Sequence, residues 1–151
     1  DYTPPSAKDL ASRLLYTCYM GTANSTDATR GRSRALAGEV GAFHLDANMD
    51  AVISALTELF VSVVGKRPAF RAHGGTDPRE NLALQNIQAR LRMVFGYMLA
   101  QLLPWSRGRR GGLLVLGTAN VDEALRGYYT KYDCSAADIN PIGSICKEDL
   151  K

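Results

Sequence analysis

Short apolar blocks alternate with longer amphipathic blocks in the first part of the chain. The run 13–20 is short, aromatic and apolar, and both it and the run 41–46 are predicted to be strands. The segment 24–40 opens with capping residues and an acid and then carries two arginines four positions apart, which predicts a helix. Apolar residues spaced by three and four over 48–65, with Gly65 at the end, predict a second helix.

The second part of the chain contains a loop, the longest periodic segment and a further apolar run. Glycine and proline residues make 65–81 a predicted loop. From Arg79 to about Leu103 apolar residues recur at steps of three and four, which predicts a long helix that Pro104 ends. The run 113–118 is the most strand-like of the sequence. The apolar stripe of the long helix consists of Leu84, Ile87, Leu91, Val94, Met98 and Leu102.

This order of elements predicts an α/β fold in which a parallel sheet lies between flanking helices. Strands that alternate with helices of this length are typical of parallel pairing with right-handed crossovers. Ligands of such sheets bind beyond the carboxyl ends of the strands. Thr118 and Glu123 follow the end of one predicted strand, and their position alone makes them candidates for a binding site.

Composition narrows the range of partners. The 151 residues suffice for one domain with a hydrophobic core, and 46% hydrophobic with 22% charged residues is typical of a globular protein. The chain has no run of about 18 apolar residues of the kind that crosses a membrane, and its first residues lack the pattern of a signal peptide. A net charge of +3 is too small to indicate nucleic-acid or membrane binding. The basic runs RGRSR and SRGRR are interpreted as solvated faces, and neither nucleic acid nor a membrane is expected as a partner.

The cysteines indicate the redox compartment. Cys18, Cys134 and Cys146 are odd in number and show no CxxC spacing, so we expect free thiols in a reducing, cytoplasmic environment. Cys134 has no activating base near it in the sequence, so a bystander thiol is favoured over a nucleophile. The sequon at Asn24 is interpreted as helix-capping chemistry rather than as a glycosylation site.

The stretch LGTANVDEALRGYYTKYD, residues 116–133, carries the first set of candidate site residues. Asp122 and Glu123 lie in the first turn of a predicted helix behind Asn120. One interpretation is that these acids only favour the helix dipole while Asn120 caps the helix. The other is that one carboxylate holds Mg²⁺, which takes few oxygens from the protein and others from phosphate. Positive charge for a polyphosphate or a substrate anion would then come from Lys131 and Lys147.

A second candidate lies on the long helix, where Asn86, Arg90, Met93 and Tyr97 fall on one strip beside the apolar stripe. An amide, a guanidinium and an aromatic ring so placed could hold a carboxylate or phosphate and stack a flat ring. A plain surface strip beside a packed helix explains the pattern equally well. The motif HGGTDP at 73–78 superficially resembles the pyrophosphate-binding loop S-G-G-x-D-S, but it lacks both serines and follows a loop, so this assignment is rejected.

Three stretches resemble a known family. CYMGTANSTDATRGR (18–32), ENLALQNIQARLRM (80–93) and the run from Gly111 to Leu150 closely resemble the synthetase domain of eukaryotic-type glutamine-dependent NAD⁺ synthetases. The resemblance covers nearly the whole chain. It implies the adenine-nucleotide alpha-hydrolase-like fold, and conversion of deamido-NAD⁺ to NAD⁺. In that reaction ATP adenylates the nicotinate carboxylate in the presence of Mg²⁺, and ammonia then displaces AMP.

The resemblance also implies roles for individual residues. The threonine of the family's Gly-Thr motif falls on Thr118, an ATP contact, and the metal-binding glutamate falls on Glu123. The lysine that contacts ATP phosphates falls on Lys147. Three contacts to deamido-NAD⁺ fall on Arg90, Lys131 and Asp138.

The same resemblance implies parts that the 151 residues do not contain. We expect the S-G-G-x-D-S loop and a nitrilase-like glutaminase domain that supplies ammonia to precede Asp1, and the synthetase domain to continue beyond Lys151. The chain alone is therefore expected to be inactive, and the protein to form homo-oligomers. Ser144 and Cys146 replace the family's glycine and serine before Lys147.

Two alternative functions remain open at this point. Another synthetase of the ATP-pyrophosphatase type would adenylate a different substrate, although the run TKYDCSAADINP argues against it. A non-catalytic helical module would use the stripe from Leu84 to Leu102 as an interface and would not bind the dinucleotide.

Overall fold

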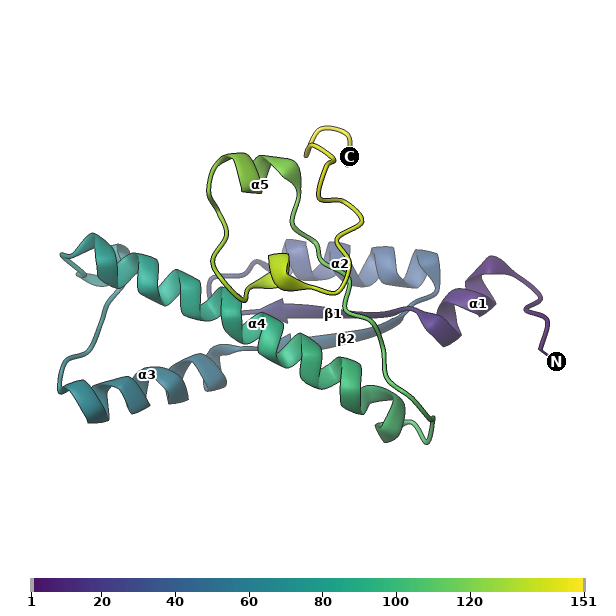
Figure 1. The fold of residues 1–151 in the computed structure, drawn as a ribbon, viewed down its shortest axis with the longest axis horizontal. Coiled ribbons are helices and arrows are strands. Elements are labelled where there is room, and N and C mark those ends of the chain that lie inside the picture. Colours follow the sequence, from purple (N-terminus) through teal and green to yellow (C-terminus); the bar gives the residue numbers. More distant parts are fainter. Residues whose placement is uncertain (1, 151) are drawn as a thin grey trace. The chain divides into compact units, whose positions relative to one another are not determined.

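The computed structural model describes residues 2–150, and the chain divides after Ala51 into two compact units. The first unit contains helix α1 (Ala7–Leu14), strand β1 (Tyr16–Gly21), helix α2 (Asp27–Val40) and strand β2 (Phe43–Asn48). The second contains most of α3 (Asp50–Val64), then α4 (Pro78–Ser106) and α5 (Val121–Leu125) (Figure 1). Two 3-10 turns, at Arg71–His73 and Cys134–Ala136, complete it.

The first unit is built around a parallel strand pair. Strands β1 and β2 pair from Tyr16 opposite Phe43 to Gly21 opposite Asn48, and α2 connects them and contacts both. Two arginines of α2, Arg30 and Arg34, form ion pairs with Asp46 of β2 at 3.2 and 3.4 Å. The predicted α/β class with a parallel sheet and flanking helices is thus confirmed.

The beginning of this unit corrects the predicted strand 13–20. Its first residues belong to α1, because the Ser6 hydroxyl accepts a hydrogen bond from the Asp9 N–H (3.1 Å) and begins a helix that lasts to Leu14. Arg13 and Asp9, four residues apart, form an ion pair on that helix at 3.5 Å. The helix begun by the Ser6 cap therefore includes the first two residues of the run 13–20, although the apolar pattern predicted a strand there.

Helix α4 begins and ends through identifiable contacts. Asp77 and Glu80 form a reciprocal capping box at its start. The prediction that Pro104 ends the helix is wrong, because the helix continues to Ser106. Proline removes the hydrogen bond to the carbonyl of Ala100, and the N–H of Leu113 fills that place at 2.8 Å.

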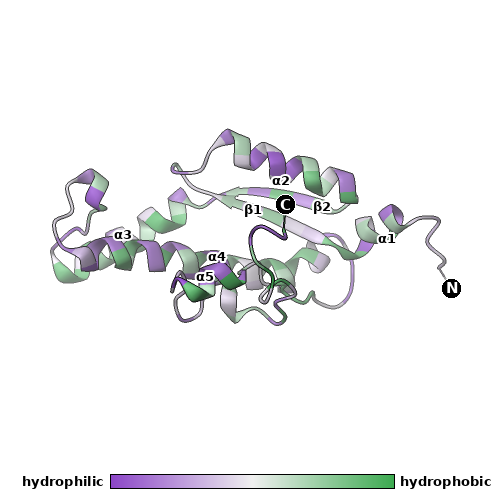
Figure 2. Cartoon of the chain, turned by 90° about the horizontal axis from the view of Figure 1, so that it is seen from above, coloured by the Kyte–Doolittle hydropathy of each residue, from purple (hydrophilic) through white to green (hydrophobic). Residues whose placement is uncertain are grey.

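The buried face of α4 differs from the predicted stripe. Leu84 is buried as expected, but Val94 and Met98 are 64% and 54% exposed. The other buried side chains of the helix are Met93, Ala100 and Pro104. Figure 2 shows polar residues interrupting the apolar positions along the helix, and none of the helices within residues 2–150 is long and apolar enough to cross a membrane.

The run 113–118 is not a regular strand in the described part of the chain. It forms one parallel bridge, between Leu116 and Ile139, and the Gly117 N–H donates to the Ile139 carbonyl at 2.7 Å. Next to this bridge the Val115 N–H donates to a side chain, Asp138 Oδ2, at 2.8 Å, and not to the backbone carbonyl of a neighbouring strand. The strand prediction was wrong because a strand needs a neighbour with matching backbone groups along its length.

Candidate functional site

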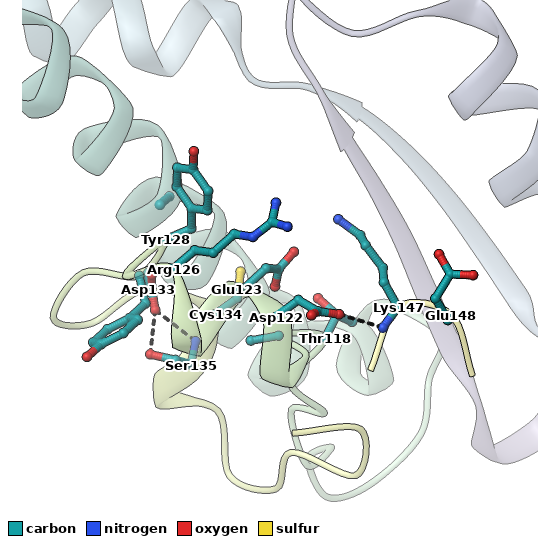
Figure 3. Close-up of a pocket in the computed structure, with 13 residues that line it drawn as sticks. Thr118, Asp122, Glu123, Arg126, Tyr128, Asp133, Cys134, Ser135, Lys147 and Glu148 are labelled. Carbon is teal, nitrogen blue, oxygen red and sulfur yellow. Dashed lines mark hydrogen bonds between the residues drawn. The ribbon is translucent and has the colours of Figure 1, made fainter. Parts of the chain in front are cut away.

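A cavity of about 650 Å³ lies in the second unit, around α5 and the segments that flank it (Figure 3). Three of the six predicted site residues line it, namely Thr118, Glu123 and Lys147. They come from the segment before α5, from α5 itself and from the segment near the C-terminal end. The fold therefore brings together the residues expected to bind ATP and metal.

The segment that carries Thr118 approaches its neighbours closely. A Cβ atom on Gly117 would lie 3.1 Å from the Cys134 carbonyl oxygen and 3.2 Å from the side chain of Asn140. The amide of Asn140 also donates to the Ala119 carbonyl at 3.0 Å. A larger residue at 117 would require the Cys134 carbonyl or the Asn140 side chain to move by a few tenths of an ångström, so the segment before Thr118 packs closely against both.

Helix α5 is capped as the sequence predicts, and the cap uses part of Glu123. Asn120 is buried, and its Oδ1 accepts from the Glu123 N–H at 3.2 Å. In return, Glu123 Oε2 accepts from the Asn120 N–H at 3.2 Å. The other oxygen, Glu123 Oε1, makes no hydrogen bond within residues 2–150, and the carboxylate lines the cavity.

The neighbouring acid, Asp122, has a different task. Its Oδ2 accepts from the backbone N–H of Lys147 at 2.7 Å, and the Val121 N–H donates to the Ile145 carbonyl at 3.2 Å. These two bonds join the N-terminal turn of α5 to the segment 145–147. The two adjacent carboxylates are therefore not equivalent, since one caps its own helix and the other holds a distant backbone.

Two cationic side chains face each other in the cavity. Figure 3 shows the side chains of Arg126 and Lys147 extending toward one another, with the Glu123 carboxylate between them. Neither cationic group forms an ion pair or side-chain hydrogen bond with the rest of the described chain. Sequence reasoning missed Arg126, although it lies three residues after Glu123 and so on the same side of the helix.

A buried carboxylate organises the loop on another side of the cavity. Asp133 Oδ2 accepts from the Thr130 N–H at 2.7 Å, and Oδ1 accepts from the N–H and hydroxyl of Ser135 at 2.8 and 2.6 Å. Burial by itself would raise the pKa of Asp133, but the bonds from Ser135 and Thr130 and the nearby charge of Arg90 bring that pKa below its usual value. The signal that could have revealed this role is the Asp-x-Ser spacing of an Asx turn.

The Asp133 loop also turns sharply just before that residue. Tyr132 has a positive φ of 65°, which a non-glycine residue adopts only where its surroundings hold it.

Cys134, next to Asp133, is not suited to act as a nucleophile. Burial and then the charge of Asp133 raise the pKa of its thiol, and the thiolate is the nucleophilic form.

Arg90 and Lys131, both predicted to contact the substrate, are brought together outside the cavity lining. Arg90 Nε donates to the Lys131 carbonyl at 2.9 Å, and Nη2 donates to the Thr130 hydroxyl at 2.7 Å. The face of α4 that carries Arg90 is therefore not a free surface strip, because Arg90 makes internal hydrogen bonds. It holds the loop from which the Lys131 side chain extends.

Asp138, the third predicted substrate contact, also lies outside the cavity lining and takes part in internal bonds. Besides the Val115 N–H, its carboxylate accepts from the Tyr97 hydroxyl at 3.3 Å, and that hydroxyl lies 3.0 Å from the Ala136 carbonyl. Burial and then the charge of Asp138 raise the pKa of Tyr97, so its hydroxyl remains a donor.

The donor set fits a hard cation that shares its shell with a phosphate. No cluster of three or more His, Cys, Asp or Glu side chains suited to a metal exists within the described residues. Glu123 has one oxygen without a hydrogen bond, which is compatible with Mg²⁺ because that ion takes only one or two carboxylates from the protein when phosphates supply other oxygens.

Comparison with known proteins identifies the family. The model of the NAD synthase family matches residues 8–151. The glutamine-dependent NAD(+) synthetase of Saccharomyces cerevisiae is 58% identical over 153 residues, covering 100% of this chain and 21% of the yeast protein. This chain thus spans about a fifth of the length of that relative.

Solved structures agree with the sequence comparison. A glutamine-dependent NAD(+) synthetase from Cytophaga hutchinsonii superposes with a TM-score of 0.73 at 28% identity, over 93% of this chain and 22% of that one. The corresponding enzyme from Acinetobacter baumannii, determined in complex with ADP, shares the fold at 20% identity, with a TM-score of 0.66 over 93% of this chain and 23% of that one. These neighbours have the adenine-nucleotide alpha-hydrolase-like fold. The chain belongs to the NAD synthase family.

Proposed function

We propose that this chain is part of an ATP-dependent amide ligase that converts deamido-NAD⁺ to NAD⁺, using ammonia derived from glutamine. One observation carries the proposal: Thr118, Glu123 and Lys147, from three separate segments, line one cavity. The names of the relatives, and a neighbour that was determined in complex with ADP, support a nucleotide as a ligand of the protein.

In the proposed reaction the cavity binds ATP, and its groups offset the negative charge of the phosphates. Thr118 offers a hydroxyl to the nucleotide, and the Lys147 ammonium, which extends into the cavity, contacts the phosphates (Figure 3). The nicotinate carboxylate attacks the α-phosphorus of ATP and pyrophosphate leaves. Glu123 would hold Mg²⁺, which would offset negative charge on the phosphates. A carboxylate is a poor acyl donor until one of its oxygens belongs to a good leaving group, and AMP provides that group.

We propose that deamido-NAD⁺ is bound by Lys131, Arg90 and Asp138. Arg90 uses two of its five N–H donors on Lys131 and Thr130, which leaves three for the dinucleotide. The same bonds hold the backbone from which Lys131 extends. The Asp138 carboxylate accepts hydrogen bonds from the Val115 N–H and the Tyr97 hydroxyl. These bonds fix its orientation, and we propose that it contacts deamido-NAD⁺ in this orientation.

The proposed partners extend beyond the two substrates. A nitrilase-like glutaminase domain would supply ammonia, as the names of the glutamine-dependent relatives suggest. We also propose a cytoplasmic location and self-association of the protein. Exposed apolar side chains of α3 and α4, among them Leu59, Val63 and Met98, support self-association.

Calorimetry on the full-length protein tests this function and separates the two binding sites. Lys147→Ala is expected to weaken ATP binding roughly ten- to a hundredfold, the size of a lost hydrogen bond to a charged group, and to leave deamido-NAD⁺ binding unchanged. Lys131→Ala is expected to do the reverse. Lys66→Ala, which removes an exposed lysine outside the cavity, is the matched control.

The same titrations distinguish the alternatives. A non-catalytic interaction module gives no heat with either nucleotide. Another ATP-pyrophosphatase-type synthetase binds ATP but not deamido-NAD⁺. Either result, or a failure of the wild-type protein to form AMP and NAD⁺ from ATP, deamido-NAD⁺ and ammonia, overturns the proposal.

A further inference from the structure

The segment that carries Lys147 contains no regular helix or strand. Residues 141–150 form successive turns, with local bonds such as the Asp149 N–H to the Cys146 carbonyl at 3.2 Å. The segment is tied to α5 by two bonds, Val121 N–H to the Ile145 carbonyl and the Lys147 N–H to Asp122 Oδ2. The second bond is the shorter, at 2.7 Å, and the charged carboxylate strengthens it (Figure 3).

The bond to Asp122 determines where the Lys147 side chain starts. Lys147 is exposed, and its ammonium forms no bond to another group within residues 2–150, so no side-chain contact fixes its position. Its backbone N–H is the anchored atom, and the side chain extends from it into the cavity opposite Glu123. A shift of the backbone would move the ammonium away from the phosphates by a similar amount.

We propose that Asp122 is a positioning residue that holds Lys147 in place for the phosphates of ATP, a role that rests on the proposed function. In this role Asp122 acts through Oδ2, which accepts from the Lys147 N–H, and not through contact with the metal or the nucleotide. Glu123, one residue later, uses one oxygen for its own helix cap and keeps the other for the cation. In this proposal Glu123 binds the metal and Asp122 positions Lys147.

A double-mutant cycle in the full-length protein tests this role. Asp122→Ala is expected to raise the KM for ATP about tenfold, the size of a lost charge-assisted bond, while the KM for deamido-NAD⁺ and the Mg²⁺ requirement stay unchanged. In a Lys147→Ala background the same change is expected to add less than twofold, because Asp122 acts through Lys147. Asp122→Asn keeps a carbonyl acceptor and is expected to recover most of the loss.

Two further measurements guard against a purely structural effect. Hydrogen exchange of the peptide around Lys147 is expected to quicken in Asp122→Ala and to remain near the wild-type rate in Asp122→Asn. Asp27→Ala removes an acid from the first turn of α2, in the first unit, and is expected to leave the KM for ATP unchanged.

The outcomes separate the two proposals. A wild-type protein that does not consume ATP overturns the proposed function and this role with it. An active wild type overturns the role of Asp122 alone if Asp122→Ala keeps a normal KM for ATP. The same conclusion follows if Asp122→Ala has its full effect without Lys147, or if it raises the Mg²⁺ requirement.

Discussion

Replacing Glu123 by glutamine in the full-length protein is expected to lower kcat/KM for ATP by roughly a hundred- to a thousandfold, the range seen when one preorganised electrostatic contact is lost. The Mg²⁺ concentration needed for half-maximal rate should rise at the same time. Glutamine retains an oxygen for the Asn120 N–H, and glutamine is accepted at this position of a capping box, so α5 should remain intact. The loss would then report on the charge that holds the cation.

Glu123→Ala separates the cap from the metal. It removes the carboxylate and with it the bond that Glu123 Oε2 accepts from the Asn120 N–H, so it is expected to reduce activity as Glu123→Gln does and to cost in addition about 1 kcal/mol of stability. Steady-state rates across a Mg²⁺ titration and thermal unfolding are the measurements. Glu39→Gln, which changes an exposed acid of α2, is the control. If the Mg²⁺ titration of Glu123→Gln overlaps that of the wild type, Glu123 is only a helix cap.

Replacing Asp133 by alanine is expected to cause the largest loss of stability in the second unit, about 3 kcal/mol. The change leaves the N–H groups of Thr130 and Ser135 without their acceptor in a partly buried place, at a cost of about 1–3 kcal/mol each. Urea unfolding of the full-length protein measures the loss, and hydrogen exchange should locate it between residues 126 and 136. Asp149→Ala, at an exposed acid, should stay within about 0.5 kcal/mol of the wild type.

The contribution of Asp133 should depend on pH in a defined direction. Its pKa is lowered in the folded protein, so the stabilisation is fully present above the unfolded value of about 3.9 and disappears as the pH falls through the folded value. The difference in unfolding free energy between wild type and Asp133→Ala should therefore be largest near pH 7 and shrink below about pH 4. A difference that stays constant down to pH 3 would mean that folding does not lower the pKa of Asp133.

The fold could be predicted from the sequence wherever a signal acts over a few residues. Helix α3 ends just before Gly65, which adopts a positive φ of 76°, and α5 begins directly after the predicted cap Asn120. Helix α1 was missed and the run 113–118 was assigned a strand. In both places an apolar pattern competed with polar partners that the pattern does not show, the Ser6 cap in one and the Asp138 carboxylate in the other.

The candidate site, too, could be predicted from the sequence only in part. The types of residue needed for a nucleotide and its cation were visible in the sequence at Thr118, Glu123 and Lys147, because carboxylate, hydroxyl and ammonium chemistry belongs to the side chains themselves. Their meeting in one cavity was not visible, and neither was the presence of Arg126 beside them.

The sequence by itself determined the local helices, the parallel βαβ start and the chemical groups available for binding. Only the tertiary structure decided which groups are free to bind. One oxygen of Asp122 accepts from the Lys147 N–H, Arg90 donates to the Thr130 hydroxyl and the Lys131 carbonyl, and one oxygen of Glu123 accepts from the Asn120 N–H. The physical reason is range: caps and periodic patterns depend on neighbours within about four residues, whereas each of these occupancies, apart from the cap of Glu123, is settled by a residue 25 or more positions away.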